Sequence, residues 1–165
     1  AVVAFQAGFE EIVWTVDPLR AANARLNFER LGAHAREYMR NVYGEHFGEG
    51  LYGGLPSDRL FVTWPIRSAR VRSRLLGRYQ PLASEALAAL PEYAPSTSES
   101  RVRLALPGDF DGLLASDPAK VREWRFRMRD NLEAAFASGY VLTGFAGRRG
   151  ESHGYYLLER NFVFE

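Results

Sequence analysis

The stretch TVDPLRAANARLNFERLGA (15–33) carries the clearest helix signals near the start of the chain. Asp17-Pro18 predicts a helix start, with Asp17 as the N-cap and Pro18 at the first helical position. Gly32 predicts the C-terminal stop of that helix. The run at 11–16 is nearly all apolar or β-branched and predicts a strand that is buried on both faces. This strand–helix unit is the starting point for the rest of the fold.

The predicted helix has two polar strips on opposite sides when it is drawn at ~100° per residue. Arg25 and Glu29 form one strip and are expected to face water. The other strip holds Arg20, Asn23 and Asn27, with Arg30 near its edge. Leu19, Ala22 and Leu26 are predicted to share one apolar stripe, while Ala21, Ala24, Phe28 and Leu31 share another. Asparagine is a poor residue for a helix interior, so the second polar strip needs an explanation.

Two interpretations of the asparagine strip remain open. In the first, Asn23 and Asn27 face a ligand that both donates and accepts hydrogen bonds. In the second, their amides satisfy buried backbone groups of a neighbouring segment or lie on a broad exposed face.

The remaining sequence predicts an α+β arrangement. Expected elements are a helix tail at 1–7, strands at 35–43 and 59–66 that pair across a glycine-rich loop, a helix after Ser68, a helix at 82–90, a polar linker ending at 100, a strand at 101–107, a turn at 109–114, a long helix from Asp117-Pro118 to Ser138, and paired antiparallel strands at 140–147 and 153–162. Both long helices begin at Asp-Pro, a device too common to indicate a duplication.

Composition narrows the classes of function. The chain has 165 residues and a net charge of +1, so neither nucleic acid nor a membrane surface is an expected partner. It has no cysteine, which excludes disulfides and a cysteine nucleophile. No apolar run approaches the ~20 residues of a membrane span, and the expected location is cytoplasmic. His34, His46 and His153 lack metal-ligand spacing, so no metal is expected.

The strand ending in VWTVDP and the helix LRAANARLNFERLGA resemble the fifth strand and following helix of the GNAT superfamily, the GCN5-related N-acetyltransferases. Asn23, Phe28 and Leu31-Gly32-Ala33 approximate the superfamily's Asn, aromatic and Leu-Gly-apolar pattern. The segments YMRNVYG, GLPSDRLFVTWPI, WRFRMRDNLEAAFASGYVLTGF and GYYLLER are similar to a branch of predicted acetyltransferases. The resemblance therefore extends over almost the whole chain.

The resemblance implies binding of acetyl-CoA or another acyl-CoA, with the pantetheine arm between the fourth and fifth strands and against the helix carrying Asn23. The implied cofactor-binding residues are Arg20, Asn23, Asn27 and Arg30. Trp14 and Asp17 are the candidates for contact with the acceptor, although helix capping alone also explains Asp17. No catalytic residue is assigned.

Two departures from the superfamily pattern stand out. The pyrophosphate-binding loop is expected before Ala1, so we expect the chain to be the C-terminal portion of a longer protein. Phe28 stands where many relatives have a tyrosine that protonates the leaving thiolate, and phenylalanine has no proton to give.

The expected fold class is α/β (α+β): a partial GNAT fold with a mixed sheet flanked by helices and a C-terminal β-α-β-β extension. The expected divisions are a GNAT part at 1–66, a helical connector and linker at 67–100, and an α+β extension at 101–165. The predicted activity is acyl transfer from acyl-CoA to a small-molecule acceptor. The alternative is a non-catalytic GNAT-like module that binds acyl-CoA or a protein, and a homodimer is left open.

Overall fold

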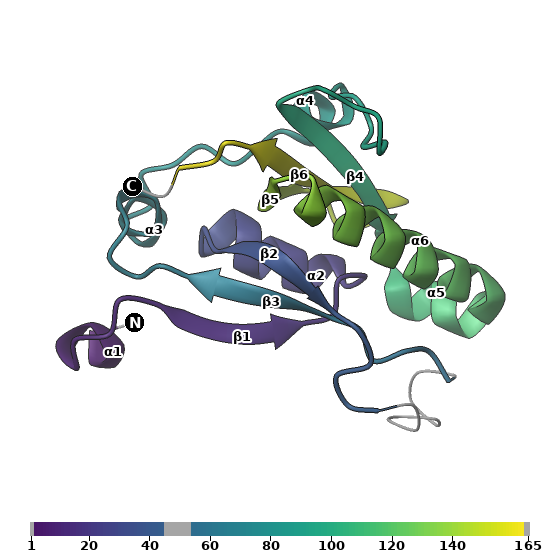
Figure 1. Ribbon diagram of the computed structural model, residues 1–165, viewed down its shortest axis with the longest axis horizontal. Helices are drawn as coiled ribbons and strands as arrows, with labels where there is room; N and C mark the ends of the chain where they lie inside the picture. Colours follow the sequence, from purple (N-terminus) through teal and green to yellow (C-terminus); the bar gives the residue numbers. More distant parts are fainter. Residues whose placement is uncertain (1, 45–53, 164–165) are drawn as a thin grey trace.

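The protein is an α+β fold built on one six-stranded sheet. A computed structural model describes residues 2–44 and 54–163. The strands are β1 (Ile12–Val16), β2 (His34–Met39), β3 (Arg59–Trp64), β4 (Arg101–Pro107), β5 (Tyr140–Ala146) and β6 (His153–Arg160). Their order across the sheet is β1-β3-β2-β5-β6-β4 (Figure 1). All neighbouring strands in this order pair antiparallel, so the prediction of a mixed sheet is wrong.

The two halves of the sheet share one topology. In the first half, β1 and β2 lie on either side of β3 and run parallel to each other. In the second half, β4 and β5 lie in the same way on either side of β6. Each half is therefore a β-α-β-β unit, and the pairing of Ala35 in β2 with Leu142 in β5 joins them. The repeated topology was not evident from the sequence, where only the Asp-Pro pairs match.

This pairing also joins the predicted segments. β2 belongs to the segment 1–66 and β5 to the segment 101–165, so one sheet runs through both. The division of the chain into domains stays a prediction.

All the described helices but the last are short. They are α1 (Val2–Gln6), α2 (Ala21–Ala24), the π-helix η1 (Arg25–Arg30), α3 (Ala69–Leu75), α4 (Ser84–Ala88), α5 (Phe110–Ser116) and α6 (Pro118–Ala137). None of the helices in the described part of the chain is long and apolar enough to cross a bilayer.

The long helix α6 forms as the sequence predicts. The Asp117 carboxylate accepts a hydrogen bond from the Lys120 amide at 3.0 Å, and Pro118 occupies the first turn. Gly139, at φ +84°, follows its end. Its buried side, which includes Trp124 and Met128, packs on the sheet (Figure 1).

Strand β6 separates two apolar clusters by its alternating side chains. Tyr156 and Leu158 belong to the main core, whereas Leu157 packs with Leu87 of α4 in a smaller cluster. The helices α6 and α4 therefore cover different faces of this half of the sheet.

Two local predictions are wrong. The segment at 109–114, expected as a turn, is the start of α5, because the Asp109 carboxylate caps it by accepting from the Gly112 amide at 3.0 Å. Strand β1 is not buried on both faces, since it is an edge strand and Val13 is 45% exposed.

Candidate functional site

The helix that carries the asparagines changes its geometry after one turn. The α-helical part α2 ends at Ala24, and η1 continues it with wider turns, in which the Leu31 amide bonds the Leu26 carbonyl at 2.9 Å. Side chains beyond Ala24 therefore depart from the ~100° spacing assumed above. Leu26, predicted on a buried stripe with Leu19, is 52% exposed. A π-helical turn is rare and occurs often at functional sites.

The asparagine strip faces strand β1. The Trp14 indole N–H donates to Asn27 Oδ1 at 3.0 Å, and Asn27 Nδ2 donates to the Asn23 carbonyl at 2.7 Å. Asn27 is only 3% exposed, so its amide serves neighbouring groups of the protein itself. This geometry supports the structural interpretation for Asn27 and leaves its cofactor-binding role a prediction.

Asn23 and Trp14 differ from Asn27 in their surroundings. Asn23 is half-buried, and no described residue forms a hydrogen bond with its side-chain amide. The Trp14 ring packs edge-on against Trp64 at 6.2 Å, and the Trp64 indole N–H donates to the Leu31 carbonyl at 2.9 Å. The two tryptophans thus hold the helix against β1 and β3, while the donors and the acceptor of the Asn23 amide have no partner among the described residues.

The two arginines predicted to bind a cofactor lie far apart. Arg20 forms an ion pair with Asp111 of α5 at 3.0 Å and lies over the Phe110 ring. Arg30 is exposed at the other end of η1. The structure does not bring these two guanidinium groups together, and Arg20 is engaged in linking α2 to α5.

Asp17 is not the N-cap of a helix, because its carboxylate has a partner from the distant helix α6. Its Oδ2 accepts from Arg125 Nη2 at 2.8 Å, and Arg59 lies at 3.7 Å. Its Oδ1 accepts from the Leu19 amide in a tight turn, and α2 begins only at Ala21, after Arg20. Helix capping therefore does not explain Asp17, and a buried ion pair does.

A second buried carboxylate, Asp58, continues this network. Arg129 of α6 donates two hydrogen bonds to it at 2.8 and 2.9 Å, and the Tyr38 hydroxyl donates a third at 2.9 Å. Burial opposes ionisation of Asp58, but these hydrogen bonds and one from the Asn41 amide lower its pKa. Burial and the Asp58 charge raise the pKa of Tyr38. The network fixes α6 to the ends of β2 and β3, and no sequence motif indicated it.

The outer edge of β1 is open. Among the described residues β1 pairs only with β3, and the Trp14–Asn27 hydrogen bond connects it to the asparagine helix. The opposite edge of the sheet is covered, since the Tyr93 amide donates to the Arg103 carbonyl of β4 and the Arg103 amide donates to the Pro91 carbonyl, both at 2.9 Å. The β1 edge therefore presents free backbone donors and acceptors beside α2.

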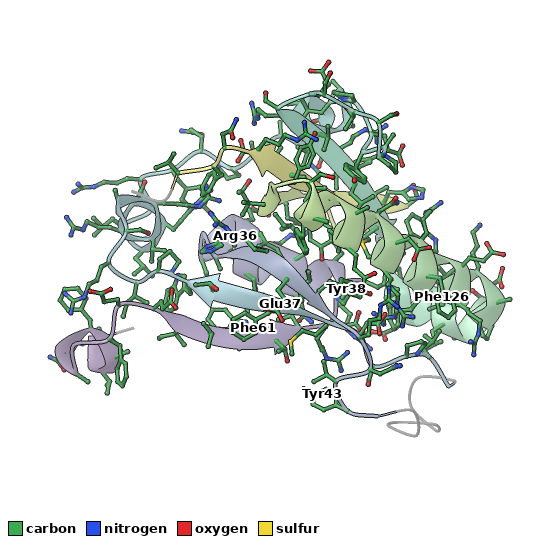
Figure 2. The ribbon with its side chains drawn as sticks, in the orientation of Figure 1. Arg36, Glu37, Tyr38, Tyr43, Phe61 and Phe126 are labelled. Carbon is green, nitrogen blue, oxygen red and sulfur yellow. The ribbon has the colours of Figure 1, made fainter. Side chains whose placement is uncertain are left out.

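Side chains of β1, β2 and β3 share the face of the sheet that carries Phe61. Figure 2 shows Glu37 and Phe61 on that face, and Thr15 of β1 lies opposite Phe61 in the strand register. Hydrogen bonds with Thr15 and Arg59 lower the pKa of Tyr43, whose ring lies under the Arg59 guanidinium. The sequence did not single out Tyr43.

Phe28 is part of the core. It is fully buried and packs edge-on against the Tyr156 ring at 5.7 Å. Its burial agrees with its predicted place on an apolar stripe with Ala24, which is also fully buried. The alignment of Phe28 with the superfamily's proton-donating tyrosine therefore has no geometric support.

A metal site finds no support in the parts of the chain that the structure describes, where no cluster of three or more histidine or carboxylate side chains forms. His34 is buried and His153 is exposed beside Ser152. His46 and most of the glycine-rich loop lie outside the described residues.

Comparison of the chain with protein-family models, curated proteins and solved structures gives no match. The resemblance to the GNAT superfamily therefore rests on the residues quoted for it, and the activity it implies is a proposal.

Proposed function

We propose that this chain forms part of an acyl-CoA-dependent acyltransferase, an N-acetyltransferase in its simplest form, which acts on a small-molecule amine. The observation that carries the proposal is the free edge of β1, a strand joined to the asparagine helix by the Trp14–Asn27 hydrogen bond. By the resemblance to the GNAT superfamily, β1 corresponds to the fifth strand of that fold, whose edge borders the pantetheine arm of the acyl-CoA.

The β1 edge suits an amide-containing ligand. A pantetheine arm carries two amides, and backbone N–H and C=O groups of an edge strand pair with such groups as they pair with an added strand. Asn23 offers a donor and an acceptor on the helix that is joined to β1 by the Trp14–Asn27 hydrogen bond. A backbone N–H of β1 can also polarise the thioester carbonyl, so the edge contributes to binding and to chemistry.

In this proposal the residues of the site have different roles. Asn23 binds the ligand through its side-chain amide, while Asn27 holds the Trp14 indole in place through a hydrogen bond. Arg20 serves the contact between α2 and α5. The thiolate of coenzyme A leaves with an ordinary pKa of ~8.5, so a proton donor on this helix is not required.

The alternative is a non-catalytic module that binds acyl-CoA. Phe28 favours it, because many relatives have a proton-donating tyrosine at this position and phenylalanine has no proton to give. Acetyl transfer to amines distinguishes the two, since the module would bind acetyl-CoA without turnover.

Calorimetry of the intact protein with acetyl-CoA tests the proposal. Asn23→Ala should weaken binding by about 0.5–1.5 kcal/mol, the value of one hydrogen bond. Asn131→Ala, also at a half-buried helix position, is the matched control and should leave binding unchanged. Undetectable binding by the wild type at millimolar ligand would refute the proposal.

A further inference from the structure

A hollow of about 490 Å³ lies on the flank of η1 that faces away from β1. Three segments that are distant in sequence line it: η1, residues 81–84 at the start of α4, and the turn between β5 and β6. Its charged residues are Arg25, Glu29 and Arg30 from η1, and Arg148 and Arg149 from the turn. The sequence predicted that Arg25 and Glu29 would simply face water.

The fold holds Arg25 at the side of this hollow. Its guanidinium donates to the Gly147 carbonyl and lies 3.8 Å from the Glu29 carboxylate. The contact with Gly147 connects η1 directly to the basic turn RRGES (148–152). The turn and the π-helix are thus fixed relative to each other by a side-chain contact across 122 positions.

Positive charge exceeds negative charge around the hollow. Four guanidinium groups line it, those of Arg25, Arg30, Arg148 and Arg149. Three carboxylates offset part of this charge: Glu29 lies beside Arg25, Glu85 pairs with Arg148 at 3.4 Å, and Glu151 accepts from the Arg148 amide at 2.8 Å and from the Ser84 hydroxyl at 3.5 Å. Within residues 2–44 and 54–163, no ion pair engages Arg30 or Arg149. Because the whole chain carries a net charge of only +1, this positive charge is a local concentration. Gathering like charges around a hollow is unfavourable unless an anion offsets them.

We propose that the hollow binds a small ligand through its phosphate groups. Guanidinium groups match phosphate oxygens with paired hydrogen bonds, and arginines from different segments can surround one anion. The volume lies within the range of small-molecule sites. No aromatic ring lines the hollow, so the site recognises the phosphate groups and provides no stacking surface for a base.

This site is separate from the one proposed for acyl-CoA. Asn27 faces Trp14 of β1, whereas Arg25, two residues earlier, faces the β5–β6 turn on the opposite flank of the same helix. The inference goes beyond the proposed acyltransferase activity and does not depend on it.

Calorimetry with pyrophosphate at low ionic strength tests the site on the intact protein. The variant Arg148→Gln/Arg149→Gln changes exposed residues of a turn, and Arg78→Gln/Arg122→Gln removes the same charge from exposed positions outside the hollow. We expect saturable binding of one pyrophosphate by the wild type, weakened roughly tenfold or more in the first variant and little changed in the second.

Three results would overturn the proposal. They are an absence of saturable binding to the wild type, equal weakening in both variants, and equal affinity of the wild type and the turn variant. Acetyl-CoA titrations of the same proteins check the separation of the sites. Unchanged acetyl-CoA affinity in the turn variant supports it, whereas a parallel loss would show that the hollow holds the phosphates of coenzyme A and that no separate site exists.

Discussion

Replacing Arg125 by methionine should lower the free energy of unfolding by about 3–5 kcal/mol, as measured by urea denaturation at neutral pH. Arg125 is 1% exposed, and its guanidinium lies 2.8 Å from the buried Asp17 carboxylate. Methionine keeps much of the aliphatic volume but leaves that carboxylate with Arg59 alone, at 3.7 Å. The cost arises from a buried charge that has lost its main partner.

Two further variants separate charge from packing. Arg122→Met removes an exposed arginine from the same helix and should change stability by no more than about 0.5 kcal/mol. Adding Asp17→Asn to Arg125→Met should recover part of the loss, because asparagine can still accept from the Leu19 amide without the charge. A loss below about 1 kcal/mol in Arg125→Met would contradict the buried pair.

Lowering the pH from about 7 to about 4.5 should reduce stability by roughly 2–3 kcal/mol through His34 alone. Burial, with the nearby charges of Arg36 and Arg70, lowers the pKa of His34 from 6.5 to about 4. Between these two values the unfolded chain binds a proton that the folded protein does not. The stabilisation is therefore complete above about pH 6.5 and is lost as the pH falls toward 4.

The variant His34→Gln isolates this contribution. Glutamine does not titrate, so the difference in unfolding free energy between the variant and the wild type should shrink or reverse as the pH falls. Asp58, whose pKa is lowered from 3.8, titrates below this window. Identical pH profiles for the two proteins between about pH 7 and about pH 4.5 would show that His34 is not held neutral by the fold.

The two Asp-Pro pairs show how far local signals reach. Asp117 is exposed, and its carboxylate caps α6 as the sequence predicted. Asp17 has the same local signal, but its carboxylate accepts a hydrogen bond from Arg125, a residue 108 positions away in the sequence. A helix start can be predicted from neighbouring residues, whereas a buried ion pair depends on contacts that the sequence does not display.

The sheet divides in a similar way. The pairing of β2 with β3 and of β5 with β6 was predicted, because the two strands of each pair are consecutive strands in the sequence. The pairing of β2 with β5 was not, since about a hundred residues separate Ala35 from Leu142. This central pairing makes one antiparallel sheet from two β-α-β-β units, and it also leaves β1 at a border.

The candidate site was partly predictable. The sequence pointed to the helix with Asn23 and Asn27, and it left open whether they serve a ligand or the protein. The structure separates them, because Asn27 is bound to Trp14 and Asn23 is not engaged through its side chain. The π-helical turn explains why a spacing of ~100° per residue misplaced Leu26. The contact of Arg25 with Gly147 depends on tertiary structure alone.

Hydrogen exchange of the backbone amides of β1 (Ile12–Val16), with and without acetyl-CoA, tests the central claim most directly. If the pantetheine arm lies along the free edge, acetyl-CoA should slow exchange of the outward-facing amides of β1, while the amides of β4 stay unchanged. Acetyl-CoA that binds without slowing exchange anywhere in β1 would contradict the claim that this edge is the acyl-CoA site.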